Sequence, residues 1–326
     1  MLSLSFANSL SDIDKAQWNS LYLYYGENQL IPLKQADSTD YQYPFLAYEF
    51  LQLLENSGAC SRDSGWQPQH ILFHRDGKLV AAIPAYLKYH SYGEYMFDWA
   101  WAEAYERHQM NYYPKLVCAV PFTPCTGPRL LFDAGISDAE KHAVFTQIAS
   151  IIEQPMTEEP ISSVHFLYLP EAVSTTLSRD YGIPQRLSYQ YHWFNRDYGS
   201  FDDFLKQLKS RKRKAIRKER KAIAQQGIAI RKVTAKESVE QDWQKISEFY
   251  RHTYLKRSGH TGYLPKNFFL QLAQAIPDNT LLFFAEYNGE TVAASLFFTS
   301  PTQLFGRYWG CKQEFDHLHF ELCYYQ

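Results

Sequence analysis

The sequence predicts an α/β protein built from two tandem domains, and three observations predict it. The segments Phe73–Ala82 and Ala285–Ala294 resemble each other and begin 212 positions apart. Each follows a helical stretch rich in aromatic residues, Pro44–Glu55 in the first half and Pro265–Ala275 in the second. The chain has 326 residues, a length typical of two ordinary domains.

Both similar segments are predicted hairpins. Asp76-Gly77 lies between two apolar runs in the first segment, and Asn288-Gly289 lies between two such runs in the second. These dipeptides adopt the left-handed conformations of the tight turn that joins neighbouring antiparallel strands. A repeat of this size indicates a duplicated domain rather than the short unit of a solenoid.

The first half, residues 1–185, is predicted to be the first domain. Aromatic and charged residues alternate through Tyr95–His108, and the prolines of Pro121–Pro128 predict a rigid loop. We place the junction with the second domain near Gly182–Arg186. The other predicted elements are helix Ile13–Tyr24, helix Pro44–Glu55, strand Arg129–Phe132, helix Ala139–Ile152 and strand Val164–Leu169.

The second half, residues 186–326, is predicted to repeat the same kind of domain. Its predicted elements are strand Tyr189–Asn195, a basic helix 200–226, strand Ile228–Val233, helix Val239–Tyr254, helix Lys266–Ala275, strands Thr280–Glu286, Glu290–Thr299 and Leu304–Trp309, and helix His317–Gln326. A strand, two helices and an antiparallel meander leading into a helix is the order of the acyl-CoA N-acyltransferase (GNAT) type of α/β fold. One more strand and helix would complete that sheet, so we expect the second domain to be truncated at its C-terminus.

The segment Lys206–Lys221 concentrates positive charge. It holds ten Lys or Arg and one acidic residue, Glu219. Subtracting them from the chain's 33 basic and 35 acidic residues leaves 23 basic against 34 acidic residues. Such a concentration repels itself and usually has an anionic partner. The alternative is a solvated charged surface with no ligand, but the acidic residues that neutralise such a helix are missing.

This basic segment is predicted to be helical. Ser200 and Asp203 fit a capping box, apolar residues recur at helical spacing, and Gly227 ends the run. One face therefore packs on the protein while the other presents cations to phosphate or carboxylate. The predicted contacts are Lys209, Arg211, Arg213, Lys214 and Arg217.

Composition excludes several classes of protein. Hydrophobic residues make up 45% of the chain, so disorder is not expected. The five cysteines are an odd number without a C-x-x-C pair, which predicts neither a disulfide framework nor a zinc site. Asp12 and Asp14 stand where a signal peptide would be apolar. No stretch is long and apolar enough to span a membrane, so we expect a cytoplasmic protein.

Three segments resemble a known family. They are Tyr112–Leu131 (YYPKLVCAVPFTPCTGPRLL), the basic core SRKRKAIRKERK, and Gly306–Gly310 (GRYWG) with His319–Gln326 (HFELCYYQ). Together they are similar to the bacterial peptidoglycan biosynthesis or recognition proteins, which are related to the Fem aminoacyl-transferases. The resemblance spans nearly the whole chain. It implies two acetyltransferase-like domains around a cleft, and acyl transfer to an amine.

Acyl transfer of this kind needs a site for a polyanion, a donor for the oxyanion and a base for the ammonium proton. The basic helix meets the first need, with a tRNA or a nucleotide-linked cell-wall precursor as the expected anionic partner. Asp98 and Glu103 are possible bases, although ordinary helix-end carboxylates look the same in a sequence. A second cluster could line a pocket, or could belong to an aromatic core: Arg107, His108, Tyr112, Tyr113 and Lys115.

A third cluster lies where acetyltransferases bind the pyrophosphate of coenzyme A: Arg307, Trp309, His319, Glu321 and Tyr324. His319 and Glu321 are further catalytic candidates. The loop Cys311–Leu318 has no glycine and carries Glu314 and Asp316, which repel phosphate. This absence favours an aminoacyl-tRNA donor over acetyl-CoA.

Three functions remain open from the sequence. The first is a Fem-like N-acyl or aminoacyl transferase acting on a cell-wall precursor or similar amine. The second is an acetyl-CoA-dependent N-acetyltransferase. The third is a non-catalytic module that binds peptidoglycan precursors or RNA through the basic helix. RNA binding would fall steeply with salt, whereas a small-ligand pocket would respond little.

Overall fold

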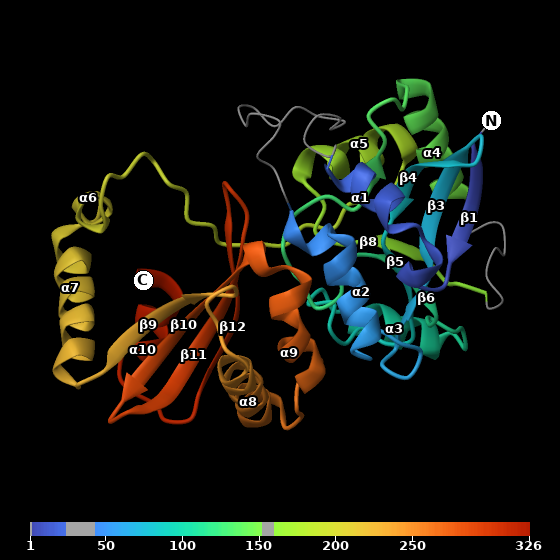
Figure 1. Cartoon of the computed structure of the whole chain (residues 1–326). Coiled ribbons are helices and arrows are strands. Elements are labelled where there is room, and N and C mark those ends of the chain that lie inside the picture. The colour runs from blue at the N-terminus through green and yellow to red at the C-terminus, as the bar shows by residue number, and fades with distance from the viewer. Residues whose placement is uncertain (1, 24–42, 152–159) are drawn as a thin grey trace. The chain divides into compact units, whose positions relative to one another are not determined.

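The protein has a mixed α/β fold, seen in a computed structural model that describes residues 2–23, 43–151 and 160–326 (Figure 1). The described chain divides into two compact units. Unit 1 consists of Met1–Gln185, Tyr263–Thr280 and Phe298–Phe305. Unit 2 consists of Arg186–Gly262, Leu281–Phe297 and Gly306–Gln326. The domain boundaries predicted from the sequence, 1–185 and 186–326, stay a prediction.

The described strands form three four-stranded sheets, with the orders β1-β3-β4-β7, β2-β5-β6-β8 and β12-β11-β10-β9. The strands are β1 (Ser3–Ala7), β2 (Trp66–Pro68), β3 (His70–Arg75), β4 (Lys78–Ile83), β5 (Ala85–Lys88), β6 (Lys115–Cys118), β7 (Leu131–Phe132), β8 (Val164–Phe166), β9 (Ala229–Thr234), β10 (Thr280–Tyr287), β11 (Glu290–Thr299) and β12 (Leu304–Cys311). Strand β6 runs parallel to β8 and antiparallel to β5.

The helices of the described residues are α1 (Lys15–Leu23), α2 (Tyr48–Asn56), α3 (Trp99–Arg107), α4 (Asp138–Ser150), α5 (Glu171–Tyr181), α6 (Phe201–Lys206), α7 (Ser210–Gln225), α8 (Glu240–Ser258), α9 (Lys266–Ala275) and the short α10 (Leu318–Phe320). Short 3₁₀ turns are η1 (Leu10–Asp12), η2 (Pro44–Leu46) and η3 (Pro277–Asn279), and a π-helical turn is η4 (Glu321–Tyr325). The predicted helix ends Tyr24 and Ile152 lie outside the described residues.

Both predicted hairpins are confirmed. Strands β3 and β4 meet at Asp76 and Gly77, which have φ of 52° and 81°. Strands β10 and β11 meet at Asn288 and Gly289, with φ of 50° and 79°. In each case β-region strands are joined by two left-handed residues, which is why Asp-Gly and Asn-Gly were informative. Whether the two halves superpose as duplicated domains stays a prediction.

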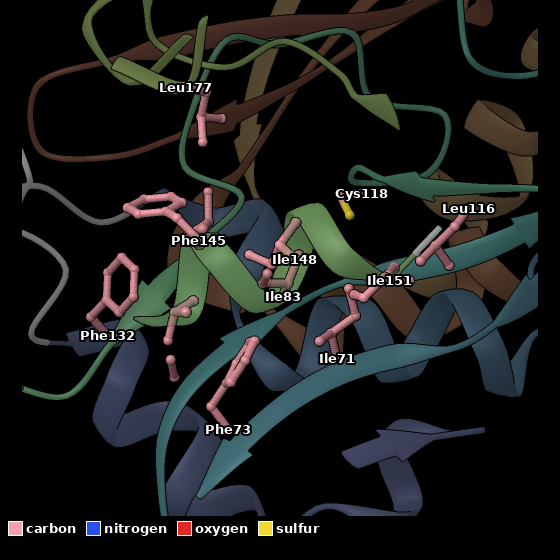
Figure 2. Packing of buried hydrophobic residues seen from close by; sticks show 14 of the residues in the cluster. Ile71, Phe73, Ile83, Leu116, Cys118, Phe132, Phe145, Ile148, Ile151 and Leu177 are labelled. Atoms are coloured by element: carbon pink, nitrogen blue, oxygen red, sulfur yellow. The ribbon is translucent and has the colours of Figure 1, made fainter. Parts of the chain in front are cut away.

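The core of unit 1 lies between its strands and helices α4 and α5 (Figure 2). Phe73, Ile83 and Leu116 come from strands, and Phe145 comes from α4. Helix α4 begins where expected because Ser137 and Glu140 form a reciprocal capping box. Truncating a buried phenylalanine such as Phe145 typically costs about 3–5 kcal/mol of stability, so this packing fixes the sheet that carries the site described below.

The prediction of a strand at Tyr189–Asn195 is wrong. Residues 186–196 have no regular secondary structure, and the apolar side chains of this segment point into solvent. Tyr189 is 93% exposed and Tyr191 is fully exposed. A strand needs a neighbouring strand for its backbone hydrogen bonds, and none of the described residues supplies one here.

The prediction of one continuous helix at 200–226 is also wrong. Ser200 caps α6 as expected, but the helix ends at Lys206 and α7 starts again at Ser210. Arg213 donates to the carbonyl oxygens of Lys206 and Leu208 at the break, at 3.5 and 3.2 Å. These bonds replace part of the helical hydrogen bonding that the break removes.

Other elements differ from the expectation at the sites that matter later. The alternating stretch Tyr95–His108 contains a helix, α3, preceded by a loop that ends at Asp98. The short strands β1, β2 and β5 were not predicted. The predicted strand Arg129–Phe132 is shorter in the structure, since β7 starts at Leu131 and leaves Arg129 outside it. The expected helix His317–Gln326 is instead a short α-helical turn followed by a π-helical turn.

Candidate active site

Two lysines lie side by side at one end of the sheet β2-β5-β6-β8. Lys88 of β5 is the register partner of Lys115 of β6, and Trp66 of β2 is the register partner of Lys88. Residues directly opposite each other on adjacent strands project from the same face of a sheet. The alternate residues Leu87 and Leu116 belong to the apolar core on the other face. Because successive side chains of a strand point to opposite faces, the two lysines lie on one face of the sheet and the two core leucines on the other.

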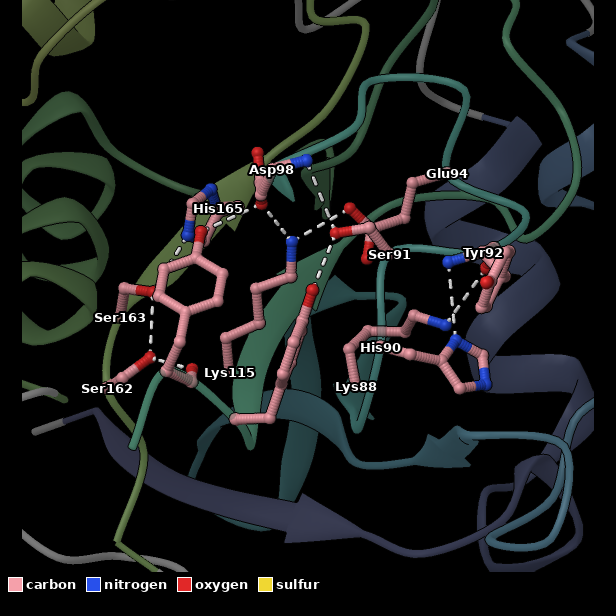
Figure 3. A network of polar contacts seen from close by, with 12 residues as sticks. Lys88, His90, Ser91, Tyr92, Glu94, Asp98, Lys115, Ser162, Ser163 and His165 are labelled. Carbon is pink, nitrogen blue, oxygen red and sulfur yellow. Dashed lines mark hydrogen bonds and ion pairs between the residues drawn. The ribbon is translucent and has the colours of Figure 1, made fainter. Parts of the chain in front are cut away.

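Lys115 is the centre of a buried ionic cluster (Figure 3). Its ammonium lies 2.8 Å from Glu94 Oε2 and also contacts Asp98 Oδ2. The Tyr112 hydroxyl donates to the same Asp98 oxygen at 2.8 Å. All four side chains are buried. Burying a charge costs several kcal/mol per ion unless the charge is paired and hydrogen-bonded. Here the Lys115 ammonium pairs with both carboxylates, which offsets that cost.

The cluster has an excess of acceptors. Glu94 Oε1 is buried and has no hydrogen-bond partner among the described residues. Burial raises the pKa of Glu94, although the nearby ammonium of Lys115 opposes the rise. The pKa of Tyr112 is also raised, first by burial and then by its hydrogen bond to Asp98. Glu94 is thus a carboxylate whose affinity for a proton is increased and whose second oxygen is free to accept one.

A hydroxyl pair borders the cluster. Ser91 Oγ lies 2.8 Å from the hydroxyl of Tyr113 and accepts from the backbone N–H of Asp98 at 3.3 Å. Burial raises the pKa of Tyr113. These contacts tie the loop before α3 to the strand that carries Lys115, and they fix the backbone position of Asp98.

Lys88 has very different surroundings from Lys115. Its ammonium lies 3.8 Å from the centre of the Trp66 ring and donates one hydrogen bond, of 3.2 Å, to the carbonyl oxygen of Tyr92. No carboxylate of the described residues forms an ion pair with it. Burial lowers the pKa of Lys88 to about 7. The site therefore holds one paired ammonium and one amine that is readily deprotonated.

Three bulky residues around this cluster have a left-handed backbone. Tyr95, Phe122 and Tyr168 have φ of 60°, 56° and 60°. The Tyr168 hydroxyl donates to the carbonyl oxygen of Glu94 at 3.1 Å, and the Phe122 ring packs on Trp66 with centroids 5.2 Å apart. Bulky residues rarely adopt this conformation, and strained backbone positions gather at functional sites.

The sequence-predicted second cluster is brought together only in part. Tyr112 and Lys115 meet Asp98, one of the two possible bases, in the buried cluster, and Tyr113 lies beside them. The other two members of the cluster, Arg107 and His108, and the other possible base, Glu103, are exposed on or just after α3. The Arg107 guanidinium lies 3.8 Å from the Glu103 carboxylate along the helix and takes no part in the cluster.

Helix α7 of unit 2 presents an uninterrupted basic stripe. At about 100° per residue, four exposed cations fall within an arc of about 80°, and the buried Ile216 and Ile223 lie on the opposite side. None of the four forms an ion pair with a described residue. We call these residues the α7 stripe: Arg211, Lys214, Lys218 and Lys221.

The other predicted residues of this helix are placed differently. Arg213 is half-buried against backbone carbonyls. Arg217 pairs with Asp202 at 2.8 Å, and Lys209 is exposed at the start of α7. The sequence suggested that Arg213 and Arg217 face a ligand, whereas the structure uses both within unit 2.

The third predicted cluster forms an aromatic group in unit 2. Trp309 and Tyr324 both pack on His319, with ring centroids 5.2 and 5.8 Å away. Glu321 is buried and pairs with Arg220 of α7 at 3.1 Å. Arg307 lies over the ring of Tyr308. Glu321 is therefore occupied with anchoring the C-terminal turns to the basic helix.

Sequence reasoning missed Glu94, Lys88, Trp66 and Ser91. Glu94 and Ser91 lie in an irregular loop, and no periodicity marks such positions. Lys88 carries a usable signal, since it ends an apolar run at a position where the strand period points inward. Its partner became apparent only when the register of β5 with β6 was known.

The family of the chain is shown by its sequence. A model of FemAB-like proteins, described as peptidoglycan biosynthesis/recognition, matches residues 9–326. The chain belongs to this FemAB-like family. None of the curated proteins is significantly similar to this FemAB-like chain in sequence.

Two solved structures are similar to the FemAB-like chain at low identity. FemX is 11% identical, with a TM-score of 0.45, and the match covers 95% of this chain and 81% of FemX. A possible acetyltransferase from Clostridium difficile 630 is 10% identical, with a TM-score of 0.32, and covers 61% of this chain and 99% of its own. Both similarities are too distant to transfer a function.

Two features are absent from the described residues. No group of three or more His, Cys, Asp or Glu there is arranged to hold a metal ion. No helix in the described ranges is long and apolar enough to cross a membrane.

Proposed function

We propose that this FemAB-like protein is an N-acyl or aminoacyl transferase that acts on an amine of a cell-wall precursor. The observation that carries the proposal is the buried cluster of Glu94, Asp98, Tyr112 and Lys115. Catalytic sites are where burial and charge pairing shift proton affinities, and the strained aromatic residues around this cluster point the same way. The family match supports the substrate class.

Each group of the cluster has a role in acyl transfer. Glu94 Oε1 accepts a proton from the ammonium of the acceptor, which leaves a neutral amine. That amine attacks the carbonyl carbon of an ester donor, a C–N bond forms, and the C–O bond breaks. The Lys115 ammonium stabilises the negative charge that develops on the carbonyl oxygen. The proton held by Glu94 then passes to the leaving oxygen, and the attacking nitrogen loses its second proton to solvent, which leaves a neutral amide. Asp98 and Tyr112 position Lys115.

Access to the cluster requires movement of the loop between β5 and α3. Gly93, at φ of 81°, lies under the Phe122 ring so closely that a Cβ atom would meet it at 2.6 Å. This loop supplies Ser91, Glu94 and Asp98, and it covers Lys88 and Lys115. We therefore propose that the loop opens to admit the acceptor amine and closes during transfer.

The donor in this proposal is a polyanion bound at the α7 stripe, such as an aminoacyl-tRNA or a nucleotide-linked precursor. Unpaired exposed Lys and Arg on one helix face are the usual means of holding phosphates. Acetyl-CoA is less favoured. After β12, Glu314 pairs with Lys256, and the following helix α10 has three residues, so few backbone amides are aligned for a pyrophosphate.

The proposal is tested by a donor and acceptor screen on the purified full-length chain. Thermal stabilisation and transfer of radiolabel are measured with aminoacyl-tRNA, acetyl-CoA and a UDP-linked muramyl pentapeptide. The wild type is compared with Glu94→Gln and with the matched control Glu171→Gln, an exposed glutamate of unit 1. We expect transfer from aminoacyl-tRNA, a loss of at least a hundredfold in Glu94→Gln and no change in the control.

Each outcome has a definite reading. Transfer from acetyl-CoA alone would replace the proposed donor by coenzyme A. Binding of precursor or RNA without any transfer would make the protein a recognition module. Equal activity in Glu94→Gln and in the wild type would show that the buried cluster takes no part in the reaction, provided that circular dichroism shows both chains folded.

A further inference from the structure

Three exposed aromatic rings lie next to one another beside the buried cluster. Phe97 and Trp99 stack, with centroids 5.4 Å apart and planes 13° from parallel. The rings of Tyr92 and Trp99 meet edge to face, with centroids 5.1 Å apart. Tyr92, Phe97 and Trp99 are 51%, 45% and 47% exposed. Exposed apolar residues that are contiguous usually mark a binding surface. We call these three residues the aromatic platform.

The platform is held rigidly by buried polar contacts. Asp98 lies between Phe97 and Trp99 in the chain, and its carboxylate is bound by Lys115 and Tyr112. The carbonyl oxygen of Tyr92 accepts from Lys88 Nζ at 3.2 Å and from Trp66 Nε1 at 3.1 Å. A ligand that binds preformed rings orders few side chains, so little affinity is lost to entropy.

A carboxylate accompanies the rings. Glu103 is four residues after Trp99 in α3, so the two side chains share a helix face. The Glu103 side chain is 68% exposed. The Arg107 guanidinium lies 3.8 Å away on one side, and the exposed oxygens can accept hydrogen bonds from hydroxyl groups. The surface therefore combines a flat apolar area with an acceptor of hydroxyl protons.

We propose that the aromatic platform binds a neutral pyranose ring of a saccharide. A pyranose has one face of C–H groups, whose partial positive charge suits the negative face of an aromatic ring. Its rim of hydroxyls donates to a carboxylate such as Glu103. The inference rests on the proposed function for the location of the reacting groups, but the binding itself needs no reaction.

A lipid surface fits these residues less well. Trp99 and Trp101 are two positions apart in α3, so they point about 200° apart around the helix and present no common face for insertion. The exposed carboxylates of Glu103 and Glu106 also repel anionic headgroups.

A nucleobase also stacks on aromatic rings, but it brings phosphates with it. Sites for nucleotides and single strands combine stacking with a positively charged groove. Here both lysines near the platform are buried, and Lys115 is already neutralised by two carboxylates. The exposed cation of α3, Arg107, is paired with Glu103. The exposed carboxylates favour an uncharged ligand instead.

The test uses the full-length chain and a β-1,4-linked disaccharide of N-acetylglucosamine, with binding measured by calorimetry and by saturation-transfer NMR. Uridine monophosphate and vesicles of phosphatidylglycerol or phosphatidylcholine are the competing probes. The variants are Trp99→Ala and Glu103→Gln. The matched control is Trp193→Ala, an exposed tryptophan of unit 2 that is 62% exposed.

We expect saturable binding of the disaccharide, weakened at least tenfold by Trp99→Ala, several-fold by Glu103→Gln and not by Trp193→Ala. No saturable binding, or equal binding in Trp99→Ala, would overturn the inference. Loss of nucleotide or vesicle binding in Trp99→Ala, without disaccharide binding, would assign the platform to that ligand instead. Acyl transfer is measured separately. Disaccharide binding without transfer would contradict the proposed function but not this inference. Transfer without disaccharide binding would contradict this inference but not the proposed function.

Discussion

The end of the sheet β2-β5-β6-β8 and the exposed face of α7 both concentrate charged residues, but the charges of the ionic cluster at the sheet are buried and paired, and those of the α7 stripe are exposed and unpaired among the described residues. At the sheet, Lys115 is buried and paired with Glu94 and Asp98. On α7, Arg211 and Lys218 are exposed and have no acidic partner among the described residues. The first arrangement is an internal site whose charges depend on one another. The second is a surface whose charges act separately on a ligand.

The comparison predicts that substitutions in the two regions have different kinds of effect. Removing one partner of a buried pair leaves the other charge uncompensated, so stability falls steeply. Removing an exposed cation changes stability little but weakens the binding of anions. The predictions below test this separation, from the largest expected effect to the smallest.

The largest effect is expected for Lys115→Met. The variant leaves the carboxylates of Glu94 and Asp98 buried without their cation, so the free energy of unfolding should fall by about 3–5 kcal/mol. Urea denaturation followed by tryptophan fluorescence measures it. The control Arg217→Met removes an exposed pair with Asp202 and should change stability by less than about 1 kcal/mol. Equal losses in the two variants would contradict the comparison.

Neutralising the α7 stripe should weaken binding without unfolding the protein. Changing its four residues, Arg211, Lys214, Lys218 and Lys221, to Gln removes contacts expected to contribute about 1–3 kcal/mol each with a polyanion. The salt dependence of tRNA binding should become shallower as well, because fewer counterions are released. Filter binding at several salt concentrations measures both. Lys232→Gln, on β9, is the control. Unchanged tRNA affinity in the quadruple variant would show that the α7 stripe is a solvated charged surface without a ligand.

Lys88 should make stability depend on pH. Its pKa in the folded chain is about 7, against an ordinary value of 10.5. Between these values the unfolded chain holds a proton that the folded chain lacks, so the wild type gains stability as pH rises. Relative to Lys88→Met, the free energy of unfolding of the wild type should rise by about 1.4 kcal/mol per pH unit above pH 7. Below pH 7 the difference between the two chains should not change with pH. Denaturation at pH 6, 7, 8 and 9 measures it, and a constant difference would contradict a desolvated lysine.

The smallest expected effect is the response to acetyl-CoA. The loop after β12 has no glycine, and its Glu314 carboxylate is paired with Lys256. Titration calorimetry at unit 2 should therefore detect no binding tighter than millimolar. A dissociation constant in the micromolar range would show that this loop accommodates a pyrophosphate, and it would favour coenzyme A as the donor.

Local signals in the sequence predicted much of the fold. The dipeptides Asp76-Gly77 and Asn288-Gly289 predicted both hairpins because turn chemistry is decided by neighbouring residues. The capping pair Ser200 and Asp203 predicted the start of α6 for the same reason. The strand predicted at Tyr189–Asn195 failed, because strand formation depends on a partner that the segment itself does not encode.

The candidate site was predicted in part. Asp98, Tyr112 and Lys115 stood out as charged or polar residues among aromatic ones. Glu94 and Lys88 did not, since their significance comes from the register of β5 with β6 and from the path of the loop between β5 and α3. Distances between side chains that are 21 positions apart, such as Glu94 and Lys115, are set by tertiary packing, which single-sequence patterns do not report.

The register of Lys88 with Lys115 also limits how this region can change in length. Successive residues of a strand point to opposite faces, so one inserted or deleted residue within β5 would turn Lys88 toward the apolar core and Leu87 toward the ionic cluster. Substitutions at either position alter one side chain, whereas a change in length exchanges the two faces at once. Among relatives of this chain, the segment from Ala85 to Lys88 is therefore expected to vary in sequence but to keep its four residues.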